Sequence, residues 1–141
     1  MKYILSIYLT FLICLNSGQA QELHGTFFDV PLVVDSAYNK LIDFAYTEGM
    51  FILSMDKKSN FLLLSKLVPK KKGFFTNGER LSFSFFIREK DKFSSVIALQ
   101  IRIEENVYKN YVSYYIDRGI TDNQVYYDPI LQRFKKFLRN Y

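Results

Sequence analysis

The stretch LSFSFFIREKDKFSSVIALQIRIE, residues 81–104, alternates between apolar and polar side chains in two runs. A period of two is typical of strands that bury one face. The charged segment EKDK between the runs is short enough for a tight connection. The stretch therefore predicts two neighbouring strands on one core. The side chains that share the apolar face are Leu81, Phe83, Phe85 and Ile87, then Phe93, Ile97, Leu99, Ile101 and Ile103.

Further strands are expected on both sides of this pair. The segments MFILSM (50–55) and FLLLSKLV (61–68), joined by the polar turn DKKSN, predict a hairpin. VYKNYVSYYIDR (107–118) predicts a fifth strand. Residues 26–29 predict an additional edge strand before Pro31, because proline cannot donate to a strand ladder.

Two amphipathic helices are expected, one before and one after these strands. Asp35 is placed to cap the first helix, and Gly49 suits the left-handed residue that ends it. Asp128 followed by Pro129 predicts the start of the second. Its apolar side is Ile130, Leu131, Phe134, Phe137, Leu138 and Tyr141, and its basic side is Arg133, Lys135, Lys136 and Arg139.

These elements predict a two-layer α+β fold, an antiparallel sheet of five to six strands with two helices on one face. The order, and DSAYNKLIDFAYTEGMFILSMDKKSNFLLLSK (35–66) in particular, resembles the helix-then-hairpin unit of small exported bacterial envelope domains. Such domains have helix-grip or TATA-binding-protein-like folds, and families of unknown function are among them. The resemblance implies an architecture and a cell-envelope location, and it transfers no activity and no functional residues.

Residues 1–20, MKYILSIYLTFLICLNSGQA, have the layout of a secretory signal peptide. Lys2 supplies a positive start, and an apolar run of about 13 residues follows, shorter than the roughly 20 that span a bilayer. Small residues then lead to an expected cleavage after Ala20. The sequence therefore predicts export to the periplasm or beyond.

Cys14 is the only cysteine and lies within this apolar run. A lipoprotein signal would have a small residue before the cysteine, whereas Ile13 stands there, so a lipid anchor is not expected. Residues 21–141 would then form a single domain without disulfides or a thiol nucleophile.

The sequence shows no arrangement of nucleophile, base or metal ligands that predicts catalysis. The single histidine, His24, lies next to the expected new N-terminus. Glu104 and Glu105 point to opposite faces of a strand, although Asp117 could approach one of them as an acid–base pair. The glycines form no phosphate-binding pattern. We therefore expect no enzymatic activity, no metal and no cofactor.

The stretch VPKKKGFFTNGER (68–80) is the strongest candidate for a contact site. We expect a loop over residues 69–78 that touches a protein partner or a membrane surface. A solvated hairpin connection turned by Asn77-Gly78 is the alternative. Export disfavours nucleic acid as the partner. The candidate residues are Lys70, Lys71, Lys72, Phe74 and Phe75.

A second candidate surface combines aromatic and basic residues near the end of the chain. Tyr114 belongs to the tyrosine-rich stretch of residues 110–129, and Arg133 and Lys136 lie on the basic side of the last helix. Tyrosine is frequent at interfaces because it combines apolar area with a polar tip. The alternative is that these rings seat the last helix on the sheet.

The sequence thus predicts an exported, non-catalytic binding or assembly module of the cell envelope, with an unknown envelope protein or a membrane surface as partner. The alternative is a carrier of a small lipid-like ligand in a pocket between sheet and helix, since the 14 phenylalanines would suit a lined pocket or a solid core. Phe86, Val96 and Ala98 interrupt the polar face of the sheet, which would allow a homodimer through that face.

Overall fold

The computed structural model describes residues 25–72 and 75–140, with the backbone alone at residues 70–72 and 75–77. The elements follow the predicted order of strand, helix, five strands and helix. Their bounds are β1 (Thr26–Val30), α2 (Val34–Thr47), β2 (Phe51–Asp56), β3 (Phe61–Lys72), β4 (Phe75–Asp91), β5 (Ser94–Lys109), β6 (Val112–Thr121) and α3 (Gln124–Arg139).

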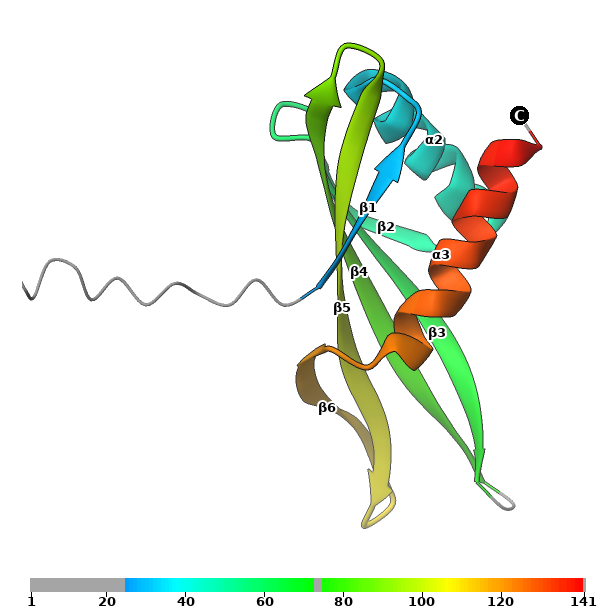
Figure 1. The fold of residues 1–141 in the computed structure, drawn as a ribbon. Coiled ribbons are helices and arrows are strands. Elements are labelled where there is room, and N and C mark those ends of the chain that lie inside the picture. Colours follow the sequence, from blue (N-terminus) through cyan, green and yellow to red (C-terminus); the bar gives the residue numbers. More distant parts are fainter. Residues whose placement is uncertain (1–24, 73–74, 141) are drawn as a thin grey trace, which may run out of the picture.

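The strands form one six-stranded antiparallel sheet in the order β1-β5-β4-β3-β2, with β6 also paired to β5. Residues 95–99 of β5 pair with β1, and residues 101–109 pair with β6. Because β4 occupies the opposite edge of β5, β1 and β6 lie one after the other along the same edge (Figure 1). The predicted position of β1 at an edge is therefore confirmed.

Both helices cover one face of the sheet, and the core lies between the two layers (Figure 1). Phe44 of α2 packs edge to face against Phe134 and Phe137 of α3, with ring centroids 5.1 and 5.6 Å apart. The two-layer α+β prediction is confirmed. The strand residues predicted to point inward and found buried are Leu81, Phe83, Phe85, Ile87, Ile97, Leu99, Ile101 and Ile103.

Helix α2 ends as predicted but begins differently. Gly49 has a φ of 63° and is the left-handed residue after the helix. Val33 occupies the N-cap without any side-chain cap, and Asp35 lies inside the first turn, so the prediction that Asp35 caps the helix is wrong. A carboxylate in the first turn still interacts favourably with the positive end of the helix dipole.

Helix α3 begins earlier than the sequence predicts. The Asn123 side chain accepts a hydrogen bond of 3.1 Å from the Val125 N–H, so Asn123 rather than Asp128 is the cap. Pro129 therefore lies inside the helix. Asparagine is as effective a helix cap as aspartate. The earlier start places Tyr127 within the helix, and its side chain is fully buried in the core.

The segment predicted as one strand over residues 107–118 is divided by a tight turn. Asn110 and Tyr111 have φ values of 53° and 64° and connect β5 to β6. Two consecutive residues with positive φ are typical of the hairpin turn that matches strand twist. Phe93, predicted to share the inward face, instead stands exposed in the turn before β5. In the described part of the chain, neither helix has the length and apolarity to span a membrane.

Candidate functional site

The β3–β4 hairpin extends beyond the rest of the sheet. Pairing of β2 with β3 stops at Ser65, and pairing of β4 with β5 stops at Glu79. The strands nevertheless continue as a pair to Lys72 and Phe75. We call this extension, residues 69–72 paired with residues 75–78, the lysine arm. In Figure 1 it projects past the part of the sheet that the helices cover.

This arm corrects the prediction of a loop over residues 69–78. Asn77 pairs with Lys70 and Gly78 with Pro69, so Asn77-Gly78 lies within β4 and does not turn the chain. Pro69 is tolerated there because β3 has no β2 neighbour at that point, and its missing N–H removes no ladder bond. The backbone of Lys70–Lys72 and Phe75 thus belongs to paired strands, whereas Phe74 lies outside the described residues.

A second hairpin arm extends from β5 and β6. Beyond Glu105, the one described strand that pairs with β5 is β6, from Asn106 opposite Tyr115 to Lys109 opposite Val112. We call residues 106–115 the tyrosine arm. The large apolar and aromatic residues exposed on it are Tyr108, Tyr111, Val112, Tyr114 and Tyr115, and Tyr111 is 92% exposed. The exposure of Tyr114 agrees with its predicted surface position.

Sequence reasoning identified Tyr114 on this arm but did not single out Tyr108 or Tyr111. The signal that could have found them is Asn110, because asparagine adopts a left-handed conformation more readily than most residues. A turn at Asn110 would have divided residues 107–118 into two strands. The tyrosines around the turn would then have been placed at a hairpin tip.

The two arms separate at a cluster of ion pairs that we call the fork. Arg80 lies 3.4 Å from the Glu104 carboxylate, and its guanidinium stacks 4.2 Å from the centre of the Tyr115 ring. Arg118 bonds the Glu105 carboxylate at 2.7 Å. These contacts join β4, β5 and β6 where the arms begin, so they hold the base of the tyrosine arm against the sheet.

The fork also contains a buried carboxylate. Glu79 is only 6% exposed, and the Tyr126 hydroxyl of α3 lies 3.5 Å from both of its carboxylate oxygens. A carboxylate removed from water needs polar partners, and Tyr126 supplies a weak one at this distance. Through this contact the first turn of α3 lies beside the base of both arms.

The carboxylates weighed as an acid–base pair take part in ion pairs. Glu104 faces Arg80, Glu105 bonds Arg118, and Asp117 bonds Arg102. The hydrogen bond from Arg102 holds the pKa of the Asp117 carboxyl below its usual value. A general acid needs the opposite shift. This geometry is that of ion pairs that join β5 to its neighbours.

Arg133 and Lys136 are both exposed on α3, as predicted. The Arg133 guanidinium bonds the Glu48 carboxylate at 2.8 Å, and the Lys66 amine lies 3.2 Å from the same group. Partial burial raises the pKa of Glu48, but these hydrogen bonds outweigh it and leave the pKa lowered. Arg133 therefore ties α3 to the end of α2.

The uncovered face of the sheet carries an apolar row across four strands. Phe27, Ala98, Phe86 and Phe61 follow one another in register, and the last two rings lie 4.7 Å apart. This row contains Phe86 and Ala98, two of the residues predicted to interrupt the polar face. Beside it lies a hollow of about 330 Å³ lined by Ser84, Gln100, Arg102, Gly119 and Ile120.

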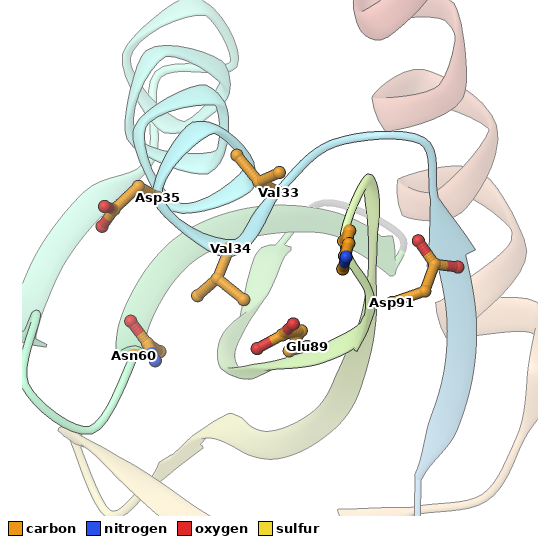
Figure 2. A pocket seen from close by; sticks show the side chains of 7 residues that line it. Val33, Val34, Asp35, Asn60, Glu89 and Asp91 are labelled. Atoms are coloured by element: carbon orange, nitrogen blue, oxygen red, sulfur yellow. The ribbon is translucent and has the colours of Figure 1, made fainter.

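A larger hollow of about 490 Å³ lies where α2 begins (Figure 2). Figure 2 shows Val34, Asn60 and Glu89 around it, contributed by α2, the turn between β2 and β3, and the end of β4. Its charged side chains are Asp35, Glu89, Asp91 and Lys92. A lining this rich in charge differs from the mostly apolar pockets that hold lipid-like ligands.

No protein-family model and no curated protein matches the chain. Solved structures with a similar fold include two from Bacteroides and Parabacteroides species. One is a DUF4468 family protein from Bacteroides ovatus, with 11% identity and a TM-score of 0.38 over 64% of this chain and 58% of that chain. The other is a TBP-like protein from Parabacteroides distasonis, with 12% identity and a TM-score of 0.41 over 80% and 82%.

The match to the DUF4468 structure spans less than two thirds of that protein's length. The second structure is described as TBP-like, one of the architectures that the order of elements resembles. At these scores, neither similarity carries an argument about function.

Proposed function

We propose that this chain is a non-catalytic binding module of the cell envelope, exported by the predicted signal peptide, and that the end of the molecule with the two arms contacts its partner. The observation that carries the proposal is the tyrosine arm. Among the residues that the structure describes, its two strands pair only with each other, and its tyrosines are exposed, with Tyr115 also stacked against Arg80. An isolated two-stranded hairpin is marginally stable in water, so an arm of this kind gains stability from a partner.

The composition of the arms supports a protein or membrane surface as partner. Exposed tyrosines supply apolar area with a polar tip, and such residues dominate the buried centres of interfaces. The lysine arm adds three successive lysines at Lys70–Lys72. Near an anionic membrane, each lysine would contribute about 1 kcal/mol. The two arms therefore join aromatic contact with positive charge at one end of the molecule.

Affinity capture from the native envelope extract tests this proposal. Two arm variants are compared with the parent chain, one with Lys70–Lys72 replaced by serine and one carrying Tyr108→Ser with Tyr111→Asn. Asparagine preserves the positive φ at the turn. The control is Tyr46→Ser, which removes an exposed tyrosine of α2 that is far from the arms in sequence.

We expect a partner that the parent and the Tyr46→Ser control retain and that at least one arm variant loses. Co-sedimentation with vesicles of anionic lipid, run with the same variants, distinguishes a membrane surface from a protein. If both arm variants capture what the parent captures and sediment as the parent does, the arms are not the contact and the proposal is wrong.

A further inference from the structure

Strand β6 has one free edge. One side of β6 pairs with β5 from Val112 to Thr121, and no strand in the described part of the chain pairs with the other side. Figure 1 shows β6 at the margin of the sheet. The connection to α3 begins only after Thr121, so it does not cover the segment Val112–Ile116. A row of backbone donors and acceptors is left facing solvent there.

The hairpin turn determines which groups these are. Lys109 and Val112 flank the two-residue turn and form the hydrogen-bonded pair that closes it. Hydrogen-bonded and non-hydrogen-bonded pairs alternate along an antiparallel ladder. Val112, Tyr114 and Ile116 therefore direct their N–H and C=O groups toward β5. Ser113 and Tyr115 direct theirs toward the free edge.

The free edge of β6 does not have the features that usually prevent strands from pairing. Val112–Ile116 contains no charged residue and no proline, and the register shift opposite Ile103–Glu104 falls beyond it. The edges formed by β1 and β2 differ. β1 carries Asp29 and is followed by Pro31, and the pairing of β2 shifts between Ile52 and Ser54. Charges, prolines and bulges are the devices that block edge pairing, so of these three edges β6 is the one open to another strand.

We propose that β6 pairs antiparallel with β6 of a second copy of this chain, around a two-fold axis at Tyr114. In this register Val112 lies opposite Ile116 of the second copy, and Ser113 lies opposite Tyr115. The groups that Ser113 and Tyr115 direct outward then bond each other on both sides of the axis. Tyr114 meets its own equivalent in a non-hydrogen-bonded pair, the arrangement that brings side chains closest.

Charge supports a second copy as the occupant. The next residues along β6 are Asp117 and Arg118, and in this register they lie opposite Tyr111 and Asn110. No like charges face each other. The Asp117 and Arg118 side chains already bond Arg102 and Glu105 of their own chain. The strand is thus complementary to itself and needs no charged partner.

A single pair of short strands buries less area than a standard stable interface, about 800 Å² per partner. We therefore expect a dimer that dissociates on dilution. The inference goes beyond the proposed function, since it concerns the edge of β6 and needs neither the lysine arm nor an envelope partner. The variant with Lys70–Lys72 replaced by serine should dimerise as the parent does.

Disulfide trapping tests the register directly, in a full chain in which Cys14, the only cysteine, is replaced by serine. Tyr114→Cys places two thiols across the axis, and a non-hydrogen-bonded pair with Cα atoms about 4.5 Å apart lies within the range that a disulfide spans. We expect Tyr114→Cys to cross-link with itself. Val112→Cys and Ile116→Cys should cross-link when mixed with each other and not singly.

Tyr46→Cys, an exposed position on α2, gives the background of random collisions. Cross-linking of Tyr114→Cys no greater than this background would overturn the proposal. Single-variant cross-linking that peaks at Ser113→Cys or Tyr115→Cys would place the axis elsewhere and overturn the register.

Sedimentation velocity over about 10–500 µM protein provides a second measurement, in the range where small interfaces dissociate. Ser113→Pro removes an N–H that faces the free edge and leaves the ladder with β5 intact. Ser113→Ala is the matched control, because both variants lose the Ser113–Asn106 side-chain hydrogen bond. We expect the parent and Ser113→Ala to become dimers as concentration rises, and Ser113→Pro to stay monomeric. A parent that is monomeric throughout, or a Ser113→Pro variant that is folded by circular dichroism and still dimerises, would refute the pairing.

Discussion

A substitution at Tyr127 should show how much stability this side chain provides at the point where β5 changes its pairing partner. Its side chain is fully buried, and its hydroxyl accepts a hydrogen bond of 3.3 Å from the Ile101 N–H and donates one of 2.7 Å to the Thr121 carbonyl. Ile101 lies where the partner of β5 changes from β1 to β6. The hydroxyl therefore satisfies backbone groups at a gap in the ladder.

The substitution Tyr127→Phe keeps the ring and removes only this hydroxyl. A typical hydrogen bond contributes about 1 kcal/mol, and a buried donor or acceptor left without a partner costs about 1–3 kcal/mol. Two such backbone groups lose their partner here. We therefore expect the free energy of unfolding to fall by about 2–3 kcal/mol. With a urea dependence of about 1.5 kcal/mol/M, the unfolding midpoint should move down by about 1–2 M.

Urea unfolding followed by circular dichroism measures this shift, and the slope of the transition should stay unchanged. The control is Tyr126→Phe, whose hydroxyl lies 3.5 Å from the Glu79 oxygens and should cost less than about 1 kcal/mol. Equal losses in the two variants, or a loss below about 0.5 kcal/mol at Tyr127, would refute the role assigned to this hydroxyl.

Three further substitutions test single contacts by urea unfolding. Glu48→Gln should lower the free energy of unfolding by about 1 kcal/mol at pH 7, because the bonds to Arg133 and Lys66 are lost. The pKa of Glu48 is lowered in the folded protein. The difference in unfolding free energy between parent and variant should therefore persist above the unfolded pKa of Glu48 and disappear as pH falls through the folded pKa. Ser95→Ala should be neutral or stabilising by up to about 1 kcal/mol, since the buried Ser95 hydroxyl has no hydrogen-bond partner among the described residues. Asn123→Ala should cost about 1 kcal/mol by removing the cap of α3, and an unchanged midpoint would contradict that assignment.

The sheet could be predicted because its strongest signal is local and repeated. Leu81, Phe83, Phe85 and Ile87 share a face in any extended conformation, and a shift of one residue would expose all of them. The register between strands did not need to be known. Phe93 follows the same alternation but lies in a turn, where alternation no longer determines which side is buried.

The turns were harder to predict because their signals compete with the ladders around them. Asn77-Gly78 is a strong turn signal, yet it is paired with Pro69 and Lys70 within a long hairpin. Asn110 forms a turn although no glycine follows it. The length of each hairpin is determined by the neighbours of its strands, and a local motif contains no information about them.

The candidate site could be predicted only in part, because local composition identifies single residues and not their contacts with distant strands. Lysine and tyrosine content drew attention to residues 69–78 and to Tyr114. The ion pairs at the fork join residues that are far apart in sequence, such as Arg80 with Glu104, and no local pattern predicts them. Arg133 was predicted only as a surface cation, because its contact with Glu48 also joins residues that are far apart in sequence.

The position of the fork has an electrostatic explanation. Glu79 and Glu105 are the last paired residues of β4 and β5, and like charges directly opposite each other destabilise a strand pair. Continued pairing would enclose these opposed carboxylates between paired residues on both sides, whereas the fork leaves them at the end of the shared ladder, where Glu105 bonds Arg118 of β6. Each strand then continues with its own hairpin partner, β4 with β3 and β5 with β6. The acidic pair thus ends the shared sheet and starts the two arms, which are the surfaces proposed to bind.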